Sequence, residues 1–138
     1  MATILVIDDQ PTVRNLLYDI LVDEGYHVVR ASDGVEGFVC LKTIVVDLIL
    51  CDIMMPLMDG NVFATRLRAD SRYDRLPLVM MSAAAEQNTL SREMYTAFLA
   101  KPFTIPALLG ILAQIAADPA GMGFLPPNGD SLPTTPSA

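Results

Sequence analysis

The chain alternates short apolar runs with longer amphipathic stretches, and this alternation limits the folds that it can adopt. Five runs have the length of strands, and the most apolar of them are typical of strands buried on both faces: 3–7, 27–30, 47–51, 78–81 and 97–100. Five intervening or following stretches are predicted to be helical: 13–21, 34–44, 59–69, a polar stretch near 86–94, and 104–117. The pattern predicts an α/β fold, a five-stranded parallel sheet with right-handed crossovers and helices on both faces.

Composition excludes several classes of function. Nine basic residues against sixteen acidic ones give a net charge of −7, and no run of Lys and Arg could follow a phosphate backbone, so we expect no direct nucleic-acid binding. The two cysteines, Cys40 and Cys51, fall in a predicted helix and a buried strand, which argues against a disulfide framework and favours a reducing cytoplasm. Asp8 and Asp9 interrupt the first apolar run before it could serve as a signal or a membrane span. We therefore expect a cytoplasmic protein with no membrane partner.

The composition changes after Ala117. Residues 118–138 hold five of the ten prolines and three of the eight glycines, and neither Lys nor Arg. We therefore expect one domain over residues 1–117 and a Pro/Gly-rich C-terminal tail or linker over 118–138. Gln114 is the one strongly polar side chain of the last helix, so its surplus apolar surface is expected to be covered by a second copy or by the tail. The tail residues suited to this are Met122, Phe124 and Leu125.

Three acidic side chains stand where predicted strands end. Asp8 and Asp9 directly follow the first strand, and Asp52 directly follows the third. The carboxyl ends of parallel strands share one edge of the sheet, so the three carboxylates are expected to converge there. Such crowding raises pKa values or requires a counter-cation, and an all-oxygen ligand set favours Mg²⁺. One Asp would be an ordinary strand end, but three at one edge predict a metal site.

A hydroxyl and an ammonium group are predicted at the same edge. Ser82 follows the fourth strand, and Lys101 follows the fifth and precedes Pro102. The ammonium suits a phosphoryl oxygen or Asp52, and the hydroxyl can donate one hydrogen bond to the same group. Alone, Lys101 could be a surface charge and Ser82 a turn residue or helix cap. Together with the acids they indicate phosphoryl chemistry.

These residues, with the run Cys-Asp-Ile-Met-Met-Pro-Leu-Met-Asp-Gly at 51–60, resemble the receiver domain of two-component response regulators. The resemblance covers about residues 2–117, and the paired acids, the phosphoacceptor, the hydroxyl and the Lys-Pro pair stand in family order. It implies a flavodoxin-like, doubly wound (βα)5 fold. It also implies a phosphorelay in which a sensor histidine kinase or a phosphotransfer protein phosphorylates the chain.

The resemblance gives each residue of the predicted site a role. Asp52 would be the phosphoacceptor, and Ser82 and Lys101 would bind the incoming phosphoryl group. Mg²⁺ would be held by four groups, namely the carboxylates of Asp8, Asp9 and Asp52 and the backbone carbonyl of Met54. Self-phosphorylation and autodephosphorylation are the expected chemistry, so we expect a signalling domain rather than an enzyme.

The resemblance also implies a switch. Phe98 stands at the position of the family's switch aromatic, and a cis bond is expected between Lys101 and Pro102. If Ser82 moves toward a phosphoryl group, Phe98 can turn inward and change the surface formed by the fourth helix, fifth strand and fifth helix. A downstream protein target, or a second copy in a homodimer, is expected to bind there. Between Ser82 and Lys101 the chain is about one helical turn shorter than usual in the family, so a short or irregular fourth helix is expected.

Three alternatives stay open. The chain could be a fragment of a larger response regulator or of a hybrid kinase. It could be a Mg²⁺-dependent phosphohydrolase, although the haloacid-dehalogenase type of site expects a second acid where Met54 stands. It could be a flavodoxin-like cofactor binder, although Asp8 and Asp9 would repel a bound phosphate.

Overall fold

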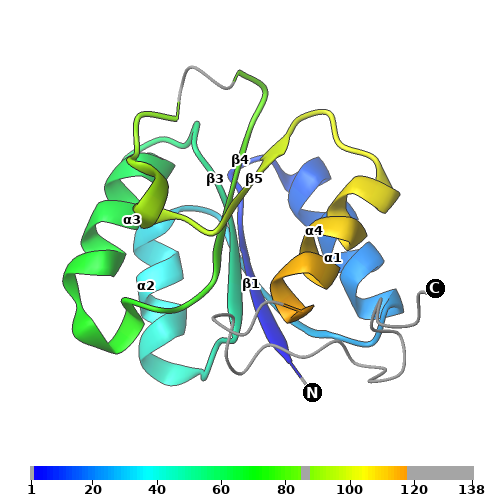
Figure 1. Ribbon diagram of the computed structural model, residues 1–138, viewed down its shortest axis with the longest axis horizontal. Coiled ribbons are helices and arrows are strands. Elements are labelled where there is room, and N and C mark those ends of the chain that lie inside the picture. Colours follow the sequence, from blue (N-terminus) through cyan, green and yellow to red (C-terminus); the bar gives the residue numbers. More distant parts are fainter. Residues whose placement is uncertain (1, 85–87, 118–138) are drawn as a thin grey trace.

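One parallel sheet organises the computed structural model, which describes residues 2–84 and 88–117 (Figure 1). Its strands lie in the order β2-β1-β3-β4-β5, and all four pairings are parallel. They are β1 (Thr3–Ile7), β2 (His27–Ala31), β3 (Leu48–Asp52), β4 (Leu78–Ser82) and β5 (Ala97–Ala100). The predicted five-stranded parallel sheet is confirmed.

Four α-helices among the described residues cover the sheet. Figure 1 shows α2 and α3 on one face and α1 and α4 on the other. Their bounds are α1 (Pro11–Asp23), α2 (Gly34–Thr43), α3 (Gly60–Ala69) and α4 (Ile105–Ala117). Local capping explains where two of them begin, because the Asp33 carboxylate accepts the N–H of Glu36 and the Asp59 carboxylate accepts that of Val62.

The two faces of the sheet build two separate cores, because strand side chains alternate between faces. On the α1 and α4 side, Val6 and Leu50 pack against apolar residues of the helices, including Leu112. On the α2 and α3 side, Ile7 and Cys51 pack in a second buried cluster. Cys51 is therefore buried packing, as its place in the predicted strand indicated.

The predicted helix near residues 86–94 is wrong for the part that the structure describes. Residues 85–87 lie outside the described residues, 88–91 form no regular element, and a single 3₁₀ turn, η3 (Arg92–Met94), leads into β5. The stretch is polar and lacks an apolar stripe, so it has little to bury against the sheet. Among described residues, the surface expected from the fourth helix, fifth strand and fifth helix is instead formed by η3, β5 and α4.

The last helix buries one side and exposes another. Leu108, Leu112 and Ile115 are buried, whereas Ile105 and Gln114 are exposed. The predicted tail at 118–138, with the apolar residues expected to cover this helix, lies outside the described residues. Among the residues described, no helix is both long and apolar enough to span a bilayer.

Arg68 of α3 forms hydrogen bonds to three segments that are not paired with one another as strands of the sheet. Its guanidinium donates hydrogen bonds to the backbone carbonyl oxygens of Tyr73 (2.8 Å), Leu76 (2.8 Å) and Met94 (3.0 Å). These carbonyls belong to the 3₁₀ turn η1 (Ser71–Tyr73), to the approach to β4 and to η3. One side chain therefore anchors the connection that stands where a fourth helix was expected.

We predict that Arg68→Met lowers the free energy of unfolding by about 2–4 kcal/mol, because partly buried carbonyls lose charge-assisted hydrogen bonds. Urea denaturation measures the change. Arg66→Met is the control, since Arg66 is exposed on the same helix and its loss should change stability by about 0.5 kcal/mol or less. Equal losses in the two variants would show that the three hydrogen bonds contribute nothing particular.

Candidate functional site

The carboxyl ends of four strands bring most of the predicted site residues together. Asp52 is the last residue of β3 and Ser82 is the last residue of β4, so each lies inside its strand rather than directly after it as predicted. Asp8 follows β1 and Lys101 follows β5. Asp8, Asp52 and Ser82 are all buried, with Asp52 only 4 % exposed. Buried polar groups at one edge of a parallel sheet are what a binding site in this type of fold requires.

Three carboxylates and one ammonium group meet at this edge. Asp8, Asp9 and Asp52 each offer a carboxylate oxygen, and these oxygens lie within 4.8 Å of one another. Lys101 Nζ lies 2.8 Å from Asp8 Oδ2 and 3.2 Å from Asp52 Oδ1. One positive charge therefore faces three potential negative charges, and the cluster keeps an excess of negative charge when all three acids are ionised.

Burial and neighbouring charges shift the pKa of two of these groups. Burial raises the pKa of Asp52 to about 6, and the negative charge of Asp8 adds to this while Lys101 opposes it. Burial alone would lower the pKa of Lys101, but its hydrogen bonds and ion pairs with Asp8 and Asp52 outweigh burial and raise it. Lys101 is therefore charged at neutral pH, and Asp52 takes up a proton as the pH falls through about 6.

Contacts that the sequence did not predict hold Asp8 in place. The carboxylate oxygen Oδ1 accepts the backbone N–H of Gln10 at 3.0 Å. The Arg14 guanidinium donates to the backbone carbonyl of Asp8 at 2.8 Å. An Arg six residues from an acid is an ordinary surface pattern, so nothing in the sequence distinguishes Arg14 as a support of this site.

The segment after β5 is fixed to β4. The backbone N–H of Lys101 donates to the carbonyl oxygen of Ser82 at 2.9 Å. The peptide bond between Lys101 and Pro102 is cis, as the resemblance implied. The ammonium group is thus attached to a backbone that is itself bonded to the neighbouring strand.

Ser82 and Phe98 lie on the same face of the sheet. Phe98 is paired with Met80 in the register of β4 and β5, and both side chains face α2 and α3. Side chains two residues apart on a strand share a face, so Ser82 lies on this side as well. The Ser82 hydroxyl donates to the carbonyl oxygen of Ala84 at 3.0 Å and lies 3.1 Å from the N–H of the same residue. Phe98 is partly buried against the second core. Its expected role as a switch stays a prediction.

The loop between β3 and α3 packs tightly against the end of β3. The N–H of Gly60 donates to the carbonyl of Ile53 at 2.8 Å, and a Cβ on Gly60 would overlap the backbone carbonyl of Asp52. A glycine is needed at this close approach. Leu57 takes a left-handed backbone conformation (φ 69°) and is exposed. The Met54 side chain is exposed too. The role predicted for Met54, as a Mg²⁺ ligand, belongs to its backbone carbonyl and does not involve the thioether.

The residues at this edge fit a magnesium ion. Carboxylates and a backbone carbonyl are hard oxygen donors, which is the ligand set that Mg²⁺ takes, usually with several waters retained. Asp8 and Asp52 are buried and Asp9 is partly exposed, so a bound cation would still face solvent on one side. A divalent charge would also offset the excess negative charge that Lys101 leaves.

At neutral pH the ionised Asp52 opposes folding of the metal-free protein. Its pKa rises from 3.8 to about 6 on folding, so the cost is absent below about pH 4 and is fully present above about pH 6. We predict that Asp52→Asn raises the free energy of unfolding in EDTA by about 1–3 kcal/mol at pH 7, and that the gain disappears by about pH 4. Chemical denaturation at the two pH values measures this, and a less stable Asn variant at pH 7 would contradict it.

Comparisons with known proteins agree with the geometry. Residues 4–113 match the family described as the response regulator receiver domain. Response regulator Rre1 of Synechocystis is 34 % identical over 119 residues, which are 83 % of this chain and 52 % of Rre1. The chemotaxis protein CheY4 of Vibrio cholerae has a TM-score of 0.77 at 32 % identity, covering 83 % of this chain and 98 % of CheY4.

A further solved structure, TrrA of Thermotoga maritima in complex with Mg(2+)-BeF, has a TM-score of 0.75 at 28 % identity, covering 83 % of this chain and 98 % of TrrA. The chain spans about half the length of Rre1, and 8–13 % of the length of sensor and hybrid histidine kinases that it also matches. The family match includes the ends of β1 and β3, where the acidic cluster lies, and the ends of β4 and β5, which carry Ser82 and Lys101. This chain belongs to the response regulator receiver domain family.

Proposed function

We propose that this chain is a phosphoacceptor of two-component signalling and that Asp52 receives the phosphoryl group. The observation that carries the proposal is the buried Asp52 carboxylate, which lies 3.2 Å from the Lys101 ammonium and beside the carboxylates of Asp8 and Asp9. Membership of the receiver family supports it, because receiver domains partner histidine kinases. The donor is the phosphohistidine of a sensor kinase or of a phosphotransfer protein.

The chemistry follows from charge. A carboxylate oxygen of Asp52 forms a bond to phosphorus while the bond from phosphorus to the donor imidazole breaks, and the imidazole leaves as a neutral ring when its other nitrogen is protonated. Both reactants are anionic, so the transition state needs cationic groups close by. Lys101 Nζ is within 3.2 Å of both buried carboxylates and can turn to a phosphoryl oxygen.

Mg²⁺ would be held by the carboxylates of Asp8, Asp9 and Asp52 and the backbone carbonyl of Met54. When bound, it supplies positive charge to the phosphoryl oxygens. Asp8 is fixed for this task by Gln10 and stays ion-paired with Lys101. Together these residues would hold a metal and accept a phosphoryl group, which fits a signalling domain rather than a classical enzyme.

The output is proposed to pass through the surface formed by η3, β5 and α4. The Ser82 hydroxyl, which bonds to Ala84 in the structure, would donate instead to the phosphoryl group. The backbone that follows Ser82 would move with it and leave space for the Phe98 ring on the same face of the sheet. A downstream protein target, or a domain joined to this one in a longer protein, would read the change.

Incubation with Mg²⁺ and a small phosphodonor should add one phosphoryl group to the wild type and none to Asp52→Asn, because Asn offers no carboxylate nucleophile. Intact-mass spectrometry measures the product. The control is Asp23→Asn, an exposed acid at the end of α1, which should be phosphorylated like the wild type. Equal labelling of Asp52→Asn would disprove the assignment, and sustained turnover of an unrelated phosphomonoester would favour a phosphohydrolase.

Lys101 and Asp9 should separate catalysis from metal binding. Lys101→Met is expected to slow phosphorylation by about 100-fold, because the transition state loses a cation, while Mg²⁺ binds as tightly as in the wild type or more tightly. Asp9→Asn is expected to weaken Mg²⁺ binding first, because a carboxylate ligand is lost. Calorimetric Mg²⁺ titration and labelling rates measure the two effects. If both variants lose Mg²⁺ affinity equally, the division of roles is wrong.

A further inference from the structure

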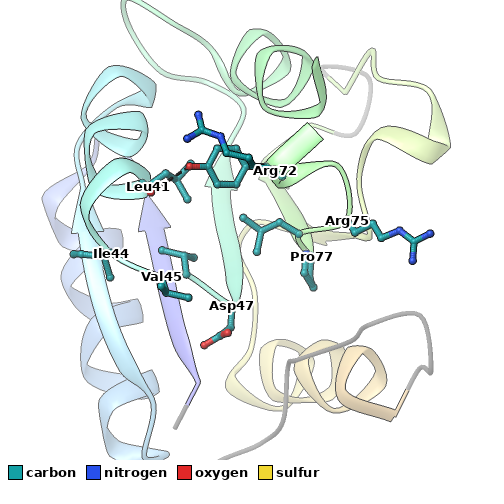
Figure 2. Close-up of a pocket in the computed structure, with 10 residues that line it drawn as sticks. Leu41, Ile44, Val45, Asp47, Arg72, Arg75 and Pro77 are labelled. Atoms are coloured by element: carbon teal, nitrogen blue, oxygen red, sulfur yellow. Dashed lines mark hydrogen bonds between the residues drawn. The ribbon is translucent and has the colours of Figure 1, made fainter. Parts of the chain in front are cut away.

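An apolar groove lies at the amino ends of β3 and β4, whereas Asp52 lies at the carboxyl end of β3 (Figure 2). It has a volume of about 420 Å³ and runs between the end of α2 and the approach to β4. Its apolar lining includes Leu41, Val46, Tyr73, Leu76 and Pro77. None of these residues takes part in the site at the carboxyl ends of the strands, so the groove needs an explanation of its own.

An apolar projection stands beside this groove. Val45 lines it and is nevertheless 84 % exposed, and the neighbouring Ile44 is also exposed. Figure 2 shows Val45 and Asp47 on one side of the groove and Arg75 and Pro77 on the other. A single exposed valine is ordinary. A protruding valine next to an apolar hollow gives the surface a knob and a hole side by side.

The two sides of the groove carry opposite charges. Asp47 stands on the side of Val45, where its Oδ2 accepts the N–H of Thr3 at 2.8 Å. Arg75 extends from the other side, and within residues 2–84 and 88–117 its guanidinium has neither a hydrogen bond nor an ion pair. Four of the chain's nine basic residues fall within 66–75. The same stretch holds two acids, Asp70 and Asp74, so its local charge is positive within a chain of net charge −7, and this lowers the repulsion that a second acidic copy would meet there.

We propose that the groove is an interface between two copies of this chain, related by a two-fold axis along the groove. Such an axis sets each side of the groove against the opposite side in the second copy. Val45 then enters the partner's groove beside Leu76 and Pro77, and Arg75 meets Asp47. The same patch offers knob, hole, cation and anion, and this self-complementarity is the reason for choosing a second copy over an unrelated partner.

The association is weak and independent of phosphorylation. A groove of this size buries less than a standard interface, so a dissociation constant on the order of 10⁻⁴ M is expected. The interface lies at the amino ends of β3 and β4, whereas Asp52 lies at their carboxyl ends. Asp52→Asn should therefore dimerise like the wild type, and failure of the dimer would leave the proposed function untouched.

Sedimentation velocity from about 10 µM to about 1 mM tests the proposal. The mass should rise with concentration from 15.0 kDa toward twice that value. Val45→Asp should weaken the dimer at least about tenfold, because a charge would enter an apolar groove. Val35→Asp is the matched control: it adds the same charge at an exposed valine of α2 outside the groove and should leave the association unchanged. Circular dichroism checks that both variants fold.

A second measurement identifies the face. In an equal mixture of isotope-labelled and unlabelled chain, intermolecular NOEs between Val45 methyl groups and Leu76 support the interface. A mass that stays at the monomer value throughout overturns it. A dimer that Val45→Asp does not weaken lies elsewhere, for example on η3, β5 and α4, and overturns it too. If deletion of residues 118–138 shifts the NMR resonances of the groove while the protein is monomeric both before and after the deletion, the chain itself fills the groove. This result also overturns the dimer.

Discussion

The repulsion between two buried carboxylates, Asp8 and Asp52, is the constraint on which the site depends. The strand order places β1 beside β3, so the two acids emerge from adjacent strands and cannot separate without breaking the sheet. Lys101 relieves part of the repulsion from the end of β5, where its backbone is bonded to Ser82. The remaining negative charge is what suits the cluster to a cation.

Such an arrangement costs stability, and the two apolar cores offset the cost. Ionisable groups are rarely buried without a partner, and the sheet could be covered more stably by apolar residues at these positions. A pKa of about 6 for Asp52 keeps most of that side chain ionised near neutral pH while leaving it close to protonation. Local conflict of this kind, inside an otherwise consistent fold, is typical of functional sites. The same conflict is absent from the groove at the other end of the sheet, whose lining is mainly apolar.

The sheet and the acidic cluster could be predicted because they follow from local patterns and one topological rule. Apolar runs marked the strands, and Asp8, Asp9 and Asp52 stood at their ends. The bounds of β1 and β5 were predicted correctly, and those of β2, β3 and β4 were off by one residue, so Asp52 lies inside β3. The hydrogen bonds of Arg14 and Arg68 could not be predicted from the sequence, because an Arg that donates to distant backbone carbonyls has no sequence pattern that distinguishes it from an exposed Arg. The predicted fourth helix failed because a polar stretch without an apolar stripe gains little from packing on the sheet.

The loss of that helix changes how a signal could travel. The connection from Ser82 to β5 ends in η3, where Arg68 holds the carbonyl of Met94. Arg92 adds hydrogen bonds to the carbonyls of Tyr95 and Thr96 just before β5. The described end of this connection, η3, is therefore fixed on one side to α3 and on the other to the approach to β5. Under the proposed switch, a partner at this edge of the domain would meet η3 and β5 rather than the face of a helix.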